Sequence, residues 1–164
     1  MASTATTLAK WLRRDKVSSL NLRDVCRVSP RDSVEQVVRA MVGCRTGFAL
    51  VMDGVDGAAR LVGIFTERDF VNRVVAAGAD VTQPVENVMT IGPKVIRLAG
   101  TVREAVEMME AGGYRHLPVV GERGEPVGVL SVKDVMRYLV GYFPARVYNL
   151  PPTPEHTQPA REGA

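Results

Sequence analysis

Two short stretches of the sequence carry residue types that could act together on a ligand. The chain reads GIFTERD around Thr66 and Asp69, and GVLSVKD around Ser131 and Asp134. In each stretch a hydroxyl residue comes three positions before an aspartate. At the start of a helix, a hydroxyl and free backbone N–H groups can bind a phosphate. A carboxylate one turn further along can accept two hydrogen bonds from the vicinal diol of a ribose. The pattern therefore predicts a receptor for a nucleoside phosphate.

The same pattern also has a purely structural interpretation. In a capping box, the hydroxyl accepts a hydrogen bond from the amide three residues later, and the acidic side chain accepts one from the cap amide. An acidic residue in the first turn is also favoured by the helix dipole. The pattern alone leaves both interpretations open.

The two stretches occupy equivalent places in a repeated order of elements. Residues 34–41 and 102–109 each place apolar side chains at i, i+3, i+4 and i+7, which predicts one face of a helix. Ser33 and Thr101 begin these helices as capping residues. An amphipathic helix also follows each aspartate. Short strands are predicted at 25–28, 48–52, 61–65, 95–98, 117–120 and 127–130.

Each copy is therefore strand, helix, strand, strand, helix, and about sixty residues bury only a marginal core. We expect an α+β fold in which two similar halves pack sheet against sheet around a pseudo-twofold axis. The predicted divisions are an N-terminal extension with a short helix at 1–20, repeats at 21–77 and 87–141, a linker at 78–86, and a proline-rich tail at 142–164. The tail composition predicts an extended or disordered segment.

Composition excludes several classes of protein. The 164 residues are 46% hydrophobic and 24% charged, as in a soluble globular protein, and no apolar run is long enough to cross a membrane. The N-terminus lacks the apolar centre of a secretory signal, so we expect a cytoplasmic protein. The net charge of +3 is scattered without a basic stripe, which argues against nucleic-acid binding.

No pattern for catalysis or metal binding is found in the sequence. The two cysteines, Cys26 and Cys44, form neither a zinc spacing nor a disulfide framework, and we expect both thiols to be buried. The two histidines, His116 and His156, have no nucleophile pattern beside them, and a glycine-rich phosphate loop is absent. We therefore expect a protein that is not an enzyme and has no catalytic cofactor.

Two such repeats, each closing on Gly, two apolar residues, Ser or Thr, two variable residues and Asp, resemble a pair of CBS domains, named for cystathionine β-synthase. The segments RHLPVV and LVGIFTERDF are also typical of that family. The resemblance covers about residues 21–141. It implies tandem CBS domains, each β-α-β-β-α, packed as a Bateman module. Such modules have one cleft on either side of the pseudo-twofold, and these commonly bind AMP, ADP, ATP, NADH or S-adenosylmethionine.

The resemblance also implies which residues form each cleft, since each takes its hydroxyl and aspartate from one repeat and its walls from the other. The first cleft would use Thr66 and Asp69, with walls from Thr90, Val95, Ile96, Tyr114, Arg115, His116, Leu117 and Pro118. The second would use Ser131 and Asp134, with walls from Val25, Cys26, Val28, Thr46, Gly47, Phe48 and Ala49. We expect the first cleft to bind anions better, because Arg115 and His116 lie at its phosphate end. A solvated arginine and a strand-edge histidine are the structural alternatives.

By the same resemblance, the chain is expected to be a stand-alone regulatory module that senses energy or redox state. AMP is the expected ligand, with ATP and NADH as alternatives. A homodimer formed through the helices and an unidentified protein target are expected as partners. The competing hypothesis is a protein–protein interaction module whose clefts are vestigial and whose repeated stretches only cap helices. Nucleic-acid binding is a third, less favoured hypothesis.

Overall fold

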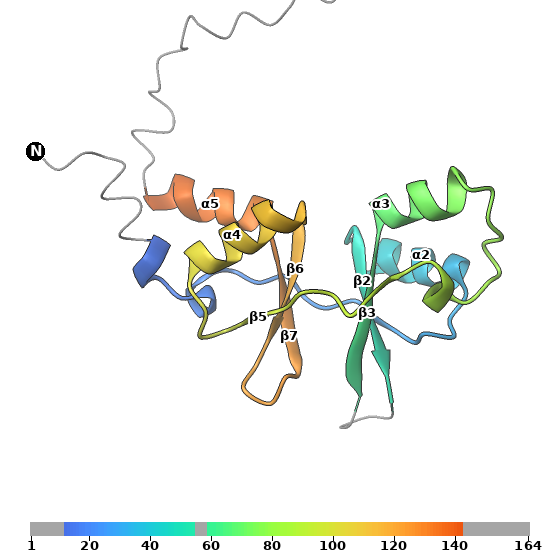
Figure 1. Cartoon of the computed structure of the whole chain (residues 1–164), viewed down its shortest axis with the longest axis horizontal. Coiled ribbons are helices and arrows are strands. Elements are labelled where there is room, and N and C mark those ends of the chain that lie inside the picture. Colours follow the sequence, from blue (N-terminus) through green and yellow to red (C-terminus); the bar gives the residue numbers. More distant parts are fainter. Residues whose placement is uncertain (1–11, 55–58, 143–164) are drawn as a thin grey trace, which may run out of the picture.

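The computed structural model of the protein describes residues 12–54 and 59–142. Figure 1 shows two halves side by side, each with a small sheet and helices on its outer side. The first half contains β1 (Arg27–Val28), α2 (Val34–Gly43), β2 (Phe48–Asp53), β3 (Arg60–Thr66), α3 (Glu67–Asp69), the π-helix η2 (Phe70–Val75), the 3₁₀ turn η3 (Val85–Asn87) and β4 (Thr90–Ile91). The second half contains the 3₁₀ turn η1 (Val17–Ser19), β5 (Ile96–Arg97), α4 (Val102–Gly112), β6 (His116–Val120), β7 (Pro126–Ser131) and α5 (Val132–Tyr142). The predicted α+β fold of two repeats is confirmed.

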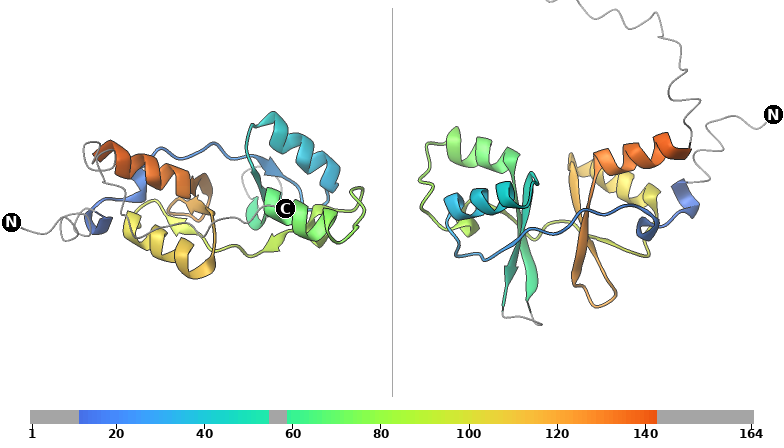
Figure 2. Two further views of the ribbon diagram at one scale, coloured as in Figure 1. Left: turned by 90° about the horizontal axis from the view of Figure 1, so that it is seen from above. Right: turned by 180° about the vertical axis from the view of Figure 1, so that it is seen from behind.

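The two sheets are built in the same way. The first has the strand order β1–β2–β3–β4 and the second β5–β6–β7. In each, the edge strand β1 or β5 runs parallel to its neighbour, and the next two strands form an antiparallel hairpin. The view from behind in Figure 2 also shows the two hairpins next to each other, one in each half.

The segment that leads into each repeat crosses over to the sheet of the other half. Strand β4 belongs by sequence to the second repeat, yet it pairs with β3 of the first half, Thr90 opposite Ile64. Correspondingly, Arg23 belongs by sequence to the first repeat but forms an antiparallel bridge with Val129 of β7. Each half is therefore completed by the other repeat.

Capping boxes begin the first helix of each repeat, as predicted. Gln36 Oε1 accepts from the Ser33 amide at 2.8 Å, and Glu104 Oε2 accepts from the Thr101 amide at 2.7 Å. The reciprocal bonds from the Gln36 and Glu104 amides to the two hydroxyls are also present. Gly113 ends α4 with φ 64°, a left-handed conformation that glycine adopts without steric cost.

Three apolar clusters hold the molecule together, one inside each half and one between them. Successive side chains of a strand point to opposite faces, so Ala49 and Val51 enter the core of the first half. Phe48 and Leu50, on the other face of β2, pack in the cluster between the sheets together with Val129 from β7. The prediction that the sheets pack face to face is confirmed.

Two short turns add to these cores from outside the predicted repeats. Val17 of η1 and Val85 of η3 are fully buried, one in each half. The Val102 amide donates to Asp15 O at 2.9 Å, and the Val34 amide donates to Gln83 O at 3.0 Å. Residues 15–20 and 83–88 therefore close the start of α4 and of α2 in the same way.

One expectation about the cysteines is wrong. Cys26 is buried as expected, but Cys44 is exposed, because it follows the last residue of α2 at a solvent-facing helix end. Burial and the neighbouring Cys44 thiol raise the pKa of Cys26 to about 12. Residues 1–11 of the predicted N-terminal extension lie outside the described residues, as do residues 143–164 of the predicted tail.

Candidate functional site

The first hydroxyl–aspartate pair forms a capping box at the start of α3. Asp69 Oδ2 accepts from the Thr66 amide at 3.0 Å and from Thr66 Oγ1 at 2.6 Å, while the Asp69 amide donates to Thr66 Oγ1 at 3.3 Å. Both short bonds to the carboxylate are on Oδ2. Among the described residues, its other oxygen, Oδ1, has only two long contacts, to Thr90 Oγ1 and to Arg73 Nε, each at 3.5 Å. Asp69 Oδ1 can therefore accept further hydrogen bonds.

The second pair forms the same capping box at the start of α5, with a different outer environment. Asp134 Oδ2 accepts from the Ser131 amide at 3.0 Å and from the Ser131 hydroxyl. Arg23 Nε also donates to Oδ2 at 3.1 Å, and Arg137 Nη1 donates to Oδ1 at 3.1 Å. The structure thus gives Asp134 two cationic partners at hydrogen-bond distance.

Burial and charge separate the two carboxylates further. The side chain of Asp134 is 3% exposed and that of Asp69 is 13% exposed. Burial alone would raise the pKa of Asp134, but hydrogen bonds from Ser131 and Arg23 outweigh it and lower that pKa below its usual range. Asp134 is therefore held as a charged, paired carboxylate.

Arg23 is the functional residue that sequence reasoning missed. Arg23 pairs with Val129 of the second half, and Thr90 pairs with Ile64 of the first half. Val129 comes 65 residues after Ile64 (129 − 64 = 65), which is also the offset between Thr66 and Ser131. Arg23 and Thr90 are therefore equivalent residues of the two lead-in segments. The glycines of the repeated stretches agree with this pairing. A Cβ on Gly128 would meet Leu22, and one on Gly63 would meet Met89, the residues just before Arg23 and Thr90.

The predicted wall residues fall into three groups. Tyr114, Arg115 and Val95 are exposed. Several others are buried in the apolar interior. These buried residues are Cys26, Val28, Phe48, Ala49, Ile96, Leu117 and Pro118. Val25, Thr46, Gly47, Thr90 and His116 are half-buried at the boundary between the halves.

His116 and Phe48 meet where the two halves join. Their ring centroids lie 5.0 Å apart with an interplanar angle of 46°. Burial, followed by the positive charges of Arg23 and Arg115, lowers the pKa of His116, while Glu67 and Asp134 act in the opposite direction. The imidazole is therefore mainly neutral at neutral pH, and Arg115 is the cationic side chain of this pair.

One predicted wall residue of the second cleft has a polar atom without a partner among the described residues. Thr46 Oγ1 is buried and has no hydrogen bond to any of the residues that the structure describes. Buried hydroxyl groups are usually hydrogen-bonded, so a free one beside a candidate ligand site marks a place for an added donor or acceptor.

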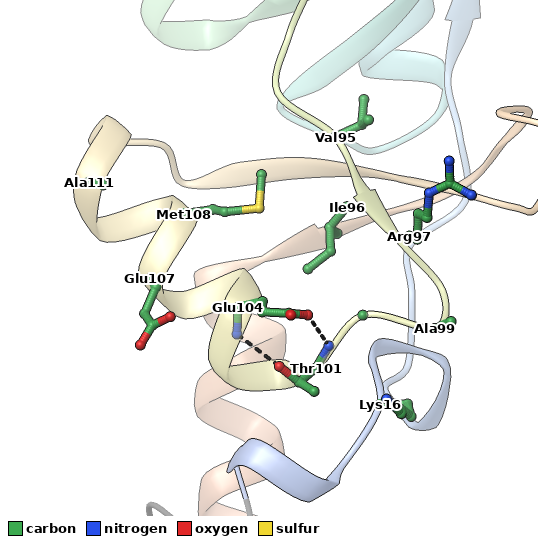
Figure 3. A pocket seen from close by; sticks show the side chains of 11 residues that line it. Lys16, Val95, Ile96, Arg97, Ala99, Thr101, Glu104, Glu107, Met108 and Ala111 are labelled. Carbon is green, nitrogen blue, oxygen red and sulfur yellow. Dashed lines mark hydrogen bonds between the residues drawn. The ribbon is translucent and has the colours of Figure 1, made fainter.

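An open groove of about 690 Å³ runs along α4 beside β5 (Figure 3). Its lining includes two predicted wall residues of the first cleft, Val95 and Ile96, together with Met108 and Ala111. Lys16, Arg97, Thr101, Glu104 and Glu107 complete the charged and polar part of the lining. The hydroxyl–aspartate pair of Thr66 and Asp69 does not line this groove.

Within residues 12–54 and 59–142, no cluster of three or more histidine, cysteine or acidic side chains could hold a metal ion. No helix in this part of the chain is long and apolar enough to cross a membrane.

The sequence model of the CBS domain matches the chain twice, at residues 17–76 and 85–141. The chain belongs to the CBS-domain family. The two matches begin at the first residues of η1 and η3, so they include the turns that complete each half.

Individual relatives agree with this assignment. An uncharacterized 17.7 kDa protein of Acidianus ambivalens is 33% identical over 125 residues, which are 76% of this chain and 73% of that protein. Inosine-5'-monophosphate dehydrogenase of Methanocaldococcus jannaschii is 30% identical over 122 residues, 74% of this chain but only 23% of the enzyme. The solved structure of a CBS domain protein from Pyrobaculum aerophilum, complexed with AMP, is 27% identical with a TM-score of 0.66, and the match covers 77% of this chain and 98% of that one. The fold is therefore that of a CBS pair.

Proposed function

We propose that the protein is a regulatory module that binds an adenosine nucleotide, with AMP as the preferred ligand, at the Thr66–Asp69 helix start. The observation that carries this proposal is that Asp69 Oδ1 has no contact shorter than 3.5 Å among the described residues. The AMP complex of the similar Pyrobaculum aerophilum protein supports the same ligand class.

Each part of the nucleotide has a complementary group at this site. The ribose diol donates to the Asp69 carboxylate, as a ribose does to the acidic residue of other nucleotide-binding folds. The phosphate lies toward the Thr66 end of α3 and the exposed guanidinium of Arg115. Adenine lies against apolar wall residues such as Val95. No bond of the nucleotide is broken, so the protein acts by binding and not as an enzyme.

Thermal unfolding with and without nucleotide tests this proposal. A ligand present at a hundredfold excess over its Kd stabilises the native state by about 2.7 kcal/mol. For a chain of this size that corresponds to a rise in Tm of roughly 5–10 °C. We expect AMP to produce such a rise, and Asp69→Asn to weaken binding by at least about tenfold because it removes a charged acceptor. Asn at position 69 keeps an acceptor for the Thr66 amide, so the helix cap survives.

Asp80→Asn is the matched control, because it neutralises an exposed carboxylate outside both clefts. It should leave the effect of AMP unchanged. If AMP, ATP and NADH all leave Tm unchanged at millimolar concentration, the nucleotide proposal is wrong.

A second candidate function is an interaction module whose clefts no longer bind a ligand. The observation in its favour is that Asp134 is fully engaged by Ser131, Arg23 and Arg137. This candidate predicts that nucleotides do not raise Tm. It also predicts that Asp69→Asn changes Tm by the same amount with and without AMP. The same melting experiment therefore separates the two functions.

In the proposed function, nucleotide binding regulates an as yet unidentified protein target by shifting the two halves or two subunits between arrangements. A ligand shifts such an equilibrium only when it binds one arrangement more tightly than the other. Energy sensing through AMP and ATP is the form we favour, with a redox signal through NADH as the alternative. We also propose a cytoplasmic homodimer that forms through the outer helices.

A further inference from the structure

The two clefts present different groups to their aspartates at equivalent positions. In the first cleft, Thr90 Oγ1 faces Asp69 Oδ1 at the long distance of 3.5 Å. In the second, Arg23 Nε donates to Asp134 Oδ2 at 3.1 Å. At these equivalent positions a neutral hydroxyl in one cleft is therefore replaced by a guanidinium in the other, and Asp69 has only the longer ion pair with Arg73 at 3.5 Å among the described residues.

The fold holds the Arg23 side chain in this place. Its amide donates to Val129 O at 3.1 Å, and its carbonyl accepts from the Val129 amide at 3.2 Å, so its backbone is fixed to β7 on both sides. The preceding Ser19 and Leu20 line a hollow of about 200 Å³ together with Asp134. Arg23 thus belongs to a lead-in segment that is packed onto the second half, and its side chain is 34% exposed.

The two carboxylates differ in how many further hydrogen bonds their oxygen atoms can accept. An ionised carboxylate has about four acceptor sites. Asp134 has four donors, namely the Ser131 amide and hydroxyl, Arg23 Nε and Arg137 Nη1. Asp69 has two short bonds, both on Oδ2. A ribose diol can therefore bind Asp69 directly, whereas at Asp134 it must first displace an arginine.

We propose that Arg23 holds the second cleft closed, so that one chain binds a single adenosine nucleotide, at Asp69, and the second cleft is a latent site. This inference rests on the proposed function. The latent cleft keeps the Ser131 hydroxyl and the unpartnered, buried Thr46 Oγ1. Removal of the guanidinium from Asp134 would thus free a nearly complete set of polar groups for a second nucleotide.

An exchange of the two equivalent residues tests the inference. Arg23→Thr copies the first cleft into the second, and Asp134 then still has Arg137 and its capping-box bonds, so it is not left as an unpaired buried charge. Titration calorimetry with AMP should give one site per chain for the wild type and two for Arg23→Thr. Adding Asp134→Asn to Arg23→Thr should return the number of sites to one.

The reciprocal variant keeps the test decisive if Arg23→Thr does not fold. Thr90→Arg places a guanidinium beside Asp69 Oδ1 and should weaken AMP binding at the first cleft by at least about tenfold, as expected for the loss of a charged hydrogen bond. The double variant with Arg23→Thr and Thr90→Arg should again bind one AMP, now at Asp134. Arg39→Ala removes an exposed arginine of α2 that pairs with Glu35 of the same helix, and it should behave like the wild type.

The outcomes separate this inference from the proposed function. Two AMP molecules on the wild-type chain, or a single one on Arg23→Thr, would overturn the inference alone. Weaker total binding by Arg23→Thr would also overturn it, because Arg23 would then be a phosphate ligand. Absence of AMP binding in the wild type and in every variant would overturn the proposed function and this inference together.

Discussion

The Phe48 and His116 rings lie 5.0 Å apart and join the two halves at equivalent positions, each opposite the hydroxyl residue of its repeated stretch. Phe48 is fully buried, and His116 is half-buried with a lowered pKa, mainly because of its burial. The contact thus places a titratable ring beside Phe48, a member of the apolar cluster between the two halves.

We predict that this contact makes the protein less stable in mild acid. In the unfolded chain the imidazole titrates near its ordinary pKa of 6.5, above the value in the folded protein. Between these two values the unfolded chain binds more protons, so the free energy of unfolding falls as pH falls through this window. Urea unfolding at pH 7 and at pH 5.5 should show this loss in the wild type. His116→Phe keeps a ring against Phe48 and should reduce the loss.

Asp134 affects stability in a more acidic window, because its folded pKa is lowered from 3.8. Its contribution to stability is present above pH 3.8 and is lost as pH falls through the pKa of the folded protein.

The His116 prediction has a control in His156→Gln, which removes the other histidine, at a position outside the described residues. An unchanged pH dependence in His116→Phe would show that His116 is not responsible.

A second prediction concerns the first glycine of each repeated stretch. A Cβ at Gly128 would lie 2.8 Å from Leu22 Cβ, which is fixed to the backbone, whereas one at Gly63 would meet the end of the Met89 side chain. Overpacking of this kind costs about 1–3 kcal/mol. We expect Gly128→Ala to lower the free energy of unfolding by this amount and Gly63→Ala by less, as measured with urea.

Gly43→Ala provides the matched control for the glycine variants. Gly43 ends α2, and a Cβ there would have no atom within 4 Å. Alanine favours a helix over glycine, so this variant should be neutral or slightly stabilising. Equal losses at Gly43 and Gly128 would contradict a packing role for the glycine beside Leu22.

A third prediction concerns the proposed homodimer. The outer helices expose apolar side chains, with Val75 of η2 61% and Met136 of α5 52% exposed. Exposed apolar surface of this kind is typical of an interaction site. Sedimentation should show a dimer at micromolar concentration, and Val75→Asp with Met136→Asp should shift it to monomers. Val127→Asp, at the exposed start of β7, should remain dimeric, and a monomeric wild type would contradict the proposal.

Much of the fold follows from local patterns in the sequence. The helices at 34–43 and 102–112 follow from apolar spacing and from capping residues, which are contacts within one turn. The hydroxyl–aspartate pairs follow for the same reason, since the two residues of each pair are three positions apart in the sequence. The family assignment follows from the repetition of these local patterns.

The different surroundings of Asp69 and Asp134 could not be predicted in this way. Arg23 and Asp134 are 111 residues apart, and their contact depends on which residue of the lead-in segment pairs with Val129 of β7. The repeats are offset by 65 residues at Thr66 and Ser131 but by 67 at Arg23 and Thr90 (90 − 23 = 67), so a fixed repeat length does not align them. The ion pair forms only when this lead-in segment packs onto the second half.

A crystal structure of the wild-type protein with AMP tests the central claim most directly. The account predicts the ribose hydroxyls within hydrogen-bond distance of Asp69 Oδ1, with the phosphate toward the Thr66 end of α3. Nucleotide density away from both helix starts, for example in the groove between β5 and α4, would contradict it.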